Sequence, residues 1–276
     1  MTATDWIAAL QRTGEIELDA RGRLRPQGRA LALFRWLDSQ FESMALEAGA
    51  RVLAVPATIQ RGTLERGGYF ESFADVAVPA EAGASAFLTP AACYHVYADL
   101  AGRGLTSPQL VTLAAPCARA DERSPTDPGR LTRFRMREIV MIGDAAGVDA
   151  NRDAWIARVT AFAGALGLVS SVEAATDTFF GGLGRGRRLI QQLKNLKYEL
   201  RMDAGAAGRI ASASFNLHES FFAERFDIRL ADGGPAASGC VAFGIERWML
   251  ACLAQLGPSR AIELTSGGVP RSTMNT

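Results

Sequence analysis

Hydrophobic residues between positions 29 and 48 recur mostly at spacings of three and four, which predicts an amphipathic helix. The recurring positions are Ala30, Leu33, Phe34, Leu37, Phe41 and Met44. Gly49 is expected to end this helix, because glycine favours the backbone conformation found just past a helix end. A short apolar strand is predicted over 52–55, and it ends at Pro56.

The middle of the chain contains two strand-like runs separated by a turn-rich segment. Residues 110–115 and 134–142 are rich in apolar and β-branched side chains, and the segment SPTDPGR between them carries two prolines. Further helices are predicted over 154–166, 187–196 and 246–256, and further strands over 210–215, 225–230 and 240–243. Strands joined by hairpins and flanked by helices, rather than alternating with them, predict an α+β fold with an antiparallel β-sheet.

The composition is that of a folded protein without a strong electrostatic bias. Hydrophobic residues make up 48% of the 276 residues, and the formal net charge is +1. A charge this small gives no general attraction to nucleic acid or to an anionic membrane. The N-terminus has no basic segment followed by an apolar run, and no apolar stretch reaches membrane-spanning length. We therefore expect a cytoplasmic protein without a membrane partner.

The sequence lacks the two commonest nucleotide-binding signatures, GxGxxG after a strand and GxxxxGK[ST]. An antiparallel sheet that binds ATP instead needs guanidinium groups for the phosphates and an apolar ring for the purine. Arg119, Phe134 and Arg247 are candidates for these parts, and Asp121 or Glu122 would accept from the adenine amino group or orient an arginine. Taken singly, each arginine also fits a solvated loop residue, and the phenylalanine fits the core.

These candidates lie in segments that resemble known motifs. CARADE followed by RLTRFRMRE resembles the second motif of class II aminoacyl-tRNA synthetases, a strand-loop-strand carrying R-x-[DE] and a later phenylalanine. AFGIER resembles the third motif, and residues 29–56 are compatible with the first, which commonly builds a dimer interface. The three occur in the family order, which implies a class II synthetase-like catalytic core and a homodimer.

Further segments resemble one particular family related to this class. TPAACYHVY, ATDTFFGG, LKYEL, ASFNLHESFF and GCVAFGIER together resemble the amino acid:[carrier protein] ligases, truncated relatives of the atypical zinc-dependent seryl-tRNA synthetases. Those ligases have no tRNA-binding domain. This chain likewise shows no long heptad arm and no basic surplus, so tRNA is not expected as a partner. The expected division is an N-terminal segment over 1–25, a catalytic domain over 26–265 and a flexible tail over 266–276.

The resemblance implies one Zn²⁺ per subunit, held by Cys93, Glu138 and Cys240. Two thiolates and a carboxylate satisfy three positions of a tetrahedron, and the fourth takes water or the α-amine of the substrate. The other two cysteines, Cys117 and Cys252, are expected to be buried core residues. Neither histidine, His95 nor His218, has a partner at metal-ligand spacing, so a histidine-based metal site is not expected.

The resemblance also implies an adenylate-forming reaction with ATP and Mg²⁺. Arg119 would hold the α-phosphate and Arg247 the terminal phosphate, while Glu199 and Asn216 would lie near the amino acid and the magnesium-bound ATP. Ser214 would lie beside them, and Lys197 would neutralise charge. Without the resemblance, KYE fits an ordinary surface strand and SFN fits a turn.

The expected product is an aminoacyl group on the phosphopantetheine thiol of an acidic carrier protein. Arg185, Arg187, Arg188 and Lys194 form a local basic stripe that would steer such a partner, or else an ordinary solvated loop. The family prefers a small amino acid such as glycine or alanine. His95 and Thr178 stand where proline is more usual, so the substrate pocket differs from the family pattern. The alternatives are a compact seryl-type aminoacyl-tRNA synthetase and a non-catalytic paralog that binds amino acid or ATP.

Overall fold

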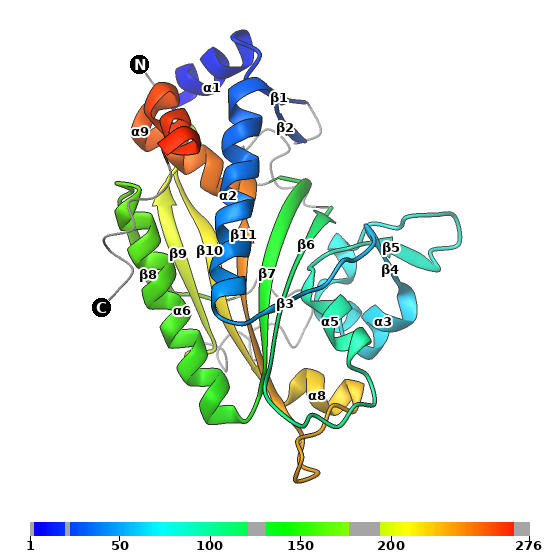
Figure 1. Ribbon diagram of the computed structural model, residues 1–276. Coiled ribbons are helices and arrows are strands. Elements are labelled where there is room, and N and C mark those ends of the chain that lie inside the picture. The colour runs from blue at the N-terminus through cyan, green and yellow to red at the C-terminus, as the bar shows by residue number, and fades with distance from the viewer. Residues whose placement is uncertain (1–2, 20–22, 121–130, 177–193, 268–276) are drawn as a thin grey trace.

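The centre of the molecule is a seven-stranded sheet, seen in a computed structural model that describes residues 3–19, 23–120, 131–176 and 194–267. Its strand order is β3-β6-β7-β11-β10-β9-β8, and every neighbouring pair is antiparallel except β3 with β6. The strands are β3 (Arg51–Val52), β6 (Gln109–Ala118), β7 (Arg133–Gly143), β8 (Ser170–Ala174), β9 (Lys197–Asp203), β10 (Arg209–Glu219) and β11 (Ala237–Gly244). The predicted α+β fold with a mainly antiparallel sheet is confirmed (Figure 1).

Helices and two small two-stranded sheets surround this sheet. One pairs β1 (Ile16–Leu18) with β2 (Leu24–Pro26), and the other pairs β4 (Thr58–Gln60) with β5 (Ala86–Leu88). The α-helices are α1 (Ala3–Arg12), α2 (Gly28–Glu47), α3 (Arg61–Arg66), α4 (Phe70–Phe73), α5 (Cys93–Asp99), α6 (Ala145–Ala165), α8 (Phe221–Phe226) and α9 (Ile245–Gly267), with 3₁₀ turns η1 (Ala74–Val76) and η2 (Gly205–Ala207). No helix in these described ranges is long and apolar enough to cross a membrane.

The long helices α2, α6 and α9 cover one side of the sheet, which we call the helix face (Figure 1). Its strand residues are large and apolar: Ile139, Met141, Leu200, Phe215, Val241 and Phe243. Phe41 of α2 stacks on Phe243 with ring centroids 4.2 Å apart, and the Trp248 ring lies edge-on to Phe41. This close aromatic packing fixes α2 and α9 against the sheet.

The predicted helix over 29–48 is confirmed as α2, and its first turn is stabilised by a distant side chain. The Glu15 carboxylate accepts from the backbone N–H groups of Arg29 and Ala30, at 2.8 and 3.0 Å. An acid near a helix N-terminus satisfies unpaired N–H groups and complements the helix dipole. The same carboxylate pairs with the Arg29 guanidinium. The helix therefore begins next to Glu15, the residue that precedes β1.

Two helix ends differ from the prediction. α6 begins at Ala145, well before the predicted residue 154, because Asp144 caps it by accepting from the Gly147 N–H at 2.8 Å. Its first turns carry small and polar residues, so hydrophobic spacing does not reveal them. The last helix was predicted to end at residue 256, but Gly257, with φ +76°, only kinks it, and helix resumes at Pro258.

One predicted element is wrong, and another lies mostly outside the described residues. The strand predicted over 225–230 is the end of α8, followed by an isolated bridge at Arg229. Buried Phe222, Ala223 and Phe226 follow helical spacing, and Asp227 ends the helix with φ +54°. The helix predicted over 187–196 is described only from residue 194, where the chain forms a turn before β9.

The remaining strands are confirmed with changed bounds. The strands predicted over 110–115 and 134–142 form the antiparallel β6–β7 hairpin, and those over 210–215 and 240–243 lie within β10 and β11. The strand predicted over 52–55 is reduced to the two residues of β3.

Candidate metal and nucleotide site

Alternation along the strands gathers most of the candidate residues on the side of the sheet opposite the helix face. We call this side the site face and define it by Glu138, Lys197, Glu199, Ser214, Asn216 and Cys240. Two cross-strand rows contain them. One runs Glu199–Ser214–Ala242–Glu138, and the next runs Lys197–Asn216–Cys240–Val140. Neighbouring strands lie about 4.8 Å apart, so each row places its members at successive strand spacings.

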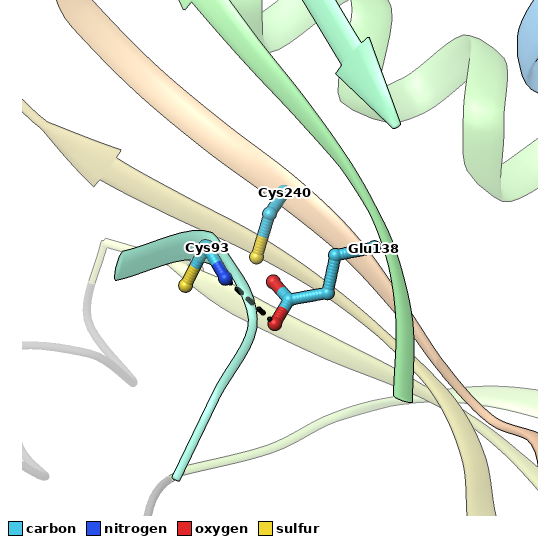
Figure 2. Close-up of side chains that lie close together, drawn as sticks. All are labelled: Cys93, Glu138 and Cys240. Atoms are coloured by element: carbon cyan, nitrogen blue, oxygen red, sulfur yellow. Dashed lines mark hydrogen bonds between the residues drawn. The ribbon is translucent and has the colours of Figure 1, made fainter. Parts of the chain in front are cut away.

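Three of the candidates converge on one point of this face. The ligand atoms of Cys93, Glu138 and Cys240 all lie within 4.8 Å of one another, and the three side chains are buried. Figure 2 shows the three residues close together, contributed by the start of α5, by β7 and by β11. The grouping joins residues that are far apart in the sequence, and it is the ligand set that the resemblance implies.

Backbone groups hold the Glu138 carboxylate in place. Its Oε1 atom accepts from the N–H groups of Ala92, at 2.7 Å, and Cys93, at 3.1 Å. One oxygen of Glu138 therefore ties β7 to the loop that carries Cys93. The same loop is tied to β6 by the Ala118 N–H, which donates to the Thr89 carbonyl at 2.9 Å.

The Cys240 thiol is positioned by β10. The Asn216 side-chain amide lies 3.4 Å from the Cys240 sulfur and also donates to Ser214 Oγ at 3.2 Å. The preceding residue, Gly239, must be glycine, because a Cβ there would lie 2.7 Å from the Asn216 carbonyl oxygen. The close β10–β11 approach at Gly239 thus brings Asn216 and Cys240 together.

The electrostatics of the cluster fit a bound cation. The hydrogen bond with Cys240, burial and the neighbouring Glu138 charge raise the pKa of the Cys93 thiol well above its usual value. Burial raises the pKa of Glu138. A divalent cation between these groups would reverse both effects by stabilising the charged forms. Two sulfurs and one carboxylate form a donor set typical of Zn²⁺ with one coordination position left open.

The two candidate phosphate-binding arginines are partly buried and held by backbone carbonyls. Arg119 Nε donates to the Pro90 carbonyl at 2.9 Å, three residues before Cys93, and its guanidinium carbon lies 5.4 Å from the Phe134 ring centroid. Arg247 Nη1 donates to the Ala211 carbonyl at 2.9 Å. Phe134 lines a surface hollow of about 320 Å³ together with Cys117, Ala118, Leu88 and others. Arg119 and the cluster therefore share the loop over 89–93.

The remaining candidates on β9 and β10 belong to strands, not to loops or turns. Lys197 and Glu199 are 12% and 15% exposed, and their charged atoms lie 3.5 Å apart. Glu199 also pairs with Arg201 at 3.1 Å. Ser214 and Asn216 lie within β10, so the interpretation of SFN as a turn is wrong. Burial of this degree also argues against an ordinary surface strand at KYE.

Some predicted residues lie outside the described ranges, and one excluded residue lies at the site. Asp121, Glu122, Arg185, Arg187, Arg188 and Thr178 are not described. Cys117 and Cys252 are buried as expected, at 2% and 0% exposure. His95 bonds to the Thr89 hydroxyl at 3.0 Å. His218, set aside from the sequence, has Nε2 3.8 Å from the Cys240 sulfur.

No protein-family profile matches the chain. It is similar to amino acid–[acyl-carrier-protein] ligase 1 of Bradyrhizobium diazoefficiens, with 36% identity over 234 residues that cover 74% of this chain and 71% of that protein. The fold resembles M. kandleri seryl-tRNA synthetase, solved in complex with A. aeolicus tRNASec, with TM-score 0.77 and 20% identity over 98% of this chain. It also resembles Pyrococcus horikoshii seryl-tRNA synthetase complexed with ATP, with TM-score 0.74 and 16% identity over 95% of this chain. The chain spans 62% of each synthetase.

Proposed function

The chain belongs to the amino acid–[acyl-carrier-protein] ligase family and is therefore a ligase, and from this premise we propose that it activates a small amino acid with ATP and transfers it to a carrier protein. The observation that carries the proposal is the buried Cys93–Glu138–Cys240 cluster, which lies on the same sheet face as Ser214 and Asn216. Such a cluster suits recognition of an amino acid's α-amine beside a nucleotide site. Glycine and alanine are the proposed substrates.

Cys93, Glu138 and Cys240 would hold Zn²⁺. When bound, the ion would supply a Lewis acid for a neutral α-amine, which would select an amino acid over other acids. Asn216 and Ser214 lie beside the cluster in the neighbouring strand and would contact the bound amino acid. Lys197 and Glu199, one strand further away, would place charge near the amino acid and the magnesium-bound ATP.

We propose that ATP binds beside the cluster through Arg119 and Arg247. Arg119 would hold the α-phosphate, because the Pro90 carbonyl fixes its guanidinium next to the loop that carries Cys93. Arg247 would hold the terminal phosphate, and the adenine would stack on the exposed part of Phe134. Mg²⁺ bound with ATP would supply positive charge that offsets the charge of the phosphates. Asp121 or Glu122, which lie outside the described residues, would accept from the adenine amino group or orient an arginine.

The reaction has two balanced steps. The amino-acid carboxylate attacks the α-phosphorus of ATP, the bond to the bridging oxygen breaks, and aminoacyl-adenylate and pyrophosphate form. The phosphopantetheine thiol then attacks the acyl carbon, loses its proton, and releases AMP. No protein nucleophile takes part, so the chain's residues act by positioning and by charge neutralisation. The basic residues Arg185, Arg187, Arg188 and Lys194 would attract an acidic carrier.

We propose a catalytic domain over 26–265, between the segments 1–25 and 266–276.

We also propose a homodimer formed through residues 29–56. Leu46 and Val52 support the dimer, since they are large apolar side chains within 29–56 that are 49% and 50% exposed. Burial of exposed apolar groups favours association. Light scattering of the purified protein tests this assembly, and a monomeric mass at micromolar concentration would contradict it.

Amino-acid-dependent exchange of pyrophosphate into ATP tests the proposed function. The zinc-replete protein is expected to catalyse exchange with glycine or alanine, because adenylate formation is reversible. No exchange with any amino acid would contradict the proposal. A phosphopantetheinylated carrier and tRNA are then offered in parallel with a labelled amino acid. Label on the carrier alone is expected, whereas label on tRNA alone would identify a seryl-type synthetase.

Substitution of one thiol tests the metal ligands. Cys240→Ser is expected to lose stoichiometric zinc after dialysis, because a serine hydroxyl is a poor replacement for a thiolate. Cys252→Ala is the matched control, since Cys252 is buried in the core cluster of the helix face. Atomic emission on the folded proteins gives the zinc content. Retained stoichiometric zinc in Cys240→Ser would show that the ligand set is wrong.

A further inference from the structure

His218 lies in an irregular part of β10, next to the candidate metal cluster. The register pairs Leu217 with Gly239 and Glu219 with Ser238. β10 therefore advances by two residues where β11 advances by one, which is a β-bulge at His218. Glu219 has φ +51°, a conformation that costs a non-glycine residue free energy. β-Bulges of this kind re-aim a side chain, and they are common beside functional sites. The bulge therefore sets the direction of the His218 ring.

Both nitrogens of that ring are close to polar partners. Nε2 lies 3.8 Å from the Cys240 sulfur, and Nδ1 lies 2.9 Å from the Tyr97 hydroxyl and 3.5 Å from the Ser238 hydroxyl. Phe222 packs edge-on against the imidazole and stacks on Tyr97 with centroids 4.1 Å apart. The ring is thus packed edge-on against two aromatic side chains that stack on each other, and each of its nitrogens has a polar atom nearby.

This arrangement is compatible with a neutral imidazole that carries its proton on Nε2. The Tyr97 side chain is fully buried, and an ordinary tyrosine keeps its proton far above neutral pH. Its hydroxyl both donates and accepts, so the tautomer depends on which role it takes toward Nδ1. When the O–H donates to Nδ1, the ring proton lies on Nε2 and faces the sulfur of Cys240. An N–H group directed at a sulfur stabilises the thiolate that binds a metal.

The contact differs from metal ligation. The group of ligand atoms that lie within 4.8 Å of one another consists of Cys93, Glu138 and Cys240, without the His218 nitrogens. Asn216 is the second N–H donor at the same sulfur, from 3.4 Å. Two residues of β10 therefore place side-chain nitrogen atoms next to the Cys240 sulfur.

We propose that His218 is a positioning residue for the metal centre, in which its Nε2–H, fixed by Tyr97, donates to the Cys240 thiolate and holds that sulfur in its ligating position. The inference rests on the zinc site of the proposed function and deepens it. In this arrangement, the hydrogen-bonded residues Tyr97, His218 and Cys240 set the orientation of the sulfur and the strength with which it donates electrons to the metal. A hydrogen-bond partner of this kind acts through a metal ligand, so its loss weakens metal binding but does not remove the metal site.

The test compares metal binding by four folded variants with that of the intact protein. Zinc affinity is measured by competition with a chromogenic chelator, and the thiolate-to-cobalt absorption band is recorded after Co²⁺ loading. His218→Ala is expected to weaken zinc binding by about 10- to 100-fold and to shift the cobalt band, since the N–H donor is lost. His218→Gln supplies an amide N–H and is expected to recover part of both. Tyr97→Phe is expected to give a smaller loss, because the ring remains but its tautomer is no longer fixed.

Phe221→Ala is the matched control, since Phe221 lies beside Phe222 but is 41% exposed. Circular dichroism of the metal-free proteins checks that each variant is folded. Wild-type affinity and an unshifted cobalt band in folded His218→Ala would overturn the inference alone. A cobalt spectrum that loses a nitrogen ligand in that variant would replace positioning by ligation and also overturn it. Absence of stoichiometric zinc from the wild-type protein would remove the zinc site itself, and with it both proposals.

Discussion

The two faces of the central sheet are made by the same strands but have different chemistry. On β7 and β11 the helix face carries Ile139, Val241 and Phe243, all fully buried against helices. The intervening positions on the site face carry Glu138 and Cys240, which are equally buried but polar. Strand alternation is what permits this division, since successive side chains point to opposite sides.

The packing of the helix face offsets the free-energy cost of burying polar groups on the site face. Burial of a carboxylate and two thiols costs free energy unless they are paired or bind a metal. The large aromatic contacts of the helix face lie one residue away along the same strands and supply stability that does not depend on the metal. The helix face should therefore control folding, and the site face should control metal and substrate binding.

Truncation of Phe243 is the strongest test of this separation. Phe243 is fully buried and stacks on Phe41, so Phe243→Ala should lower the free energy of unfolding by about 3–5 kcal/mol. Urea denaturation measures the loss, and Phe221→Ala on the exposed side of α8 is the control. The folded fraction should keep wild-type zinc affinity. A large loss of affinity in folded protein would mean that the two faces are coupled.

The helix face was largely predictable from the sequence, because its residues repeat with a regular period. The spacing of Leu33, Leu37 and Phe41 predicts α2, and the runs over 110–115 and 134–142 predict the β6–β7 hairpin. The predictions fail where the hydrophobic spacing does not match the secondary structure that forms. Small residues conceal the start of α6, and the strand predicted over 225–230 is a helix end followed by an isolated bridge.

The site face was predictable only through resemblance to a family. Cys93, Glu138 and Cys240 have no informative spacing, because three separate elements bring them together. His218 was excluded for lack of a partner at ligand spacing. Its relation to Cys240 depends on a bulge and on pairing between β10 and β11, and neither leaves a periodic pattern in the sequence.

The junction between the two faces gives a pH-dependent prediction. β11 ends opposite Met136, and the Glu246 carboxylate then accepts from the Arg135 N–H at 2.8 and 3.0 Å. Burial raises the pKa of Glu246 from 4.5 to about 7. The folded protein thus holds a proton that the unfolded chain releases at lower pH, so this stabilisation is present below pH 4.5 and is lost as the pH rises through 7.

Glu246→Gln should remove that dependence, since an amide does not titrate. The free energy of unfolding of the wild type, relative to this variant, should fall by roughly 3 kcal/mol between about pH 4.5 and pH 8. Urea denaturation at a series of pH values measures it. Glu263→Gln, at an exposed residue of α9 that pairs with Arg260, is the control. A difference that is independent of pH would show that folding leaves the pKa of Glu246 unchanged.

Arg137 gives the smallest effect and the sharpest test, because it lies on the helix face next to Glu138 in sequence. Its guanidinium is 5% exposed and pairs with Asp38 at 2.5 Å and Glu42 at 3.3 Å on α2. Removing one partner of a buried pair leaves an uncompensated charge. Here Arg135 still pairs with Asp38, and Glu42 is 36% exposed, so Arg137→Met should cost about 2 kcal/mol rather than more.

Zinc affinity of folded Arg137→Met should stay at the wild-type value, because the Ala92 and Cys93 N–H groups still hold Glu138. Urea denaturation and chelator competition measure the two quantities on the same protein. Arg137→Lys is the matched variant, since it keeps the charge and should recover part of the stability. If instead zinc affinity falls in parallel with stability across both variants, the ion pairs with α2 position Glu138 through the strand, and the faces are not independent.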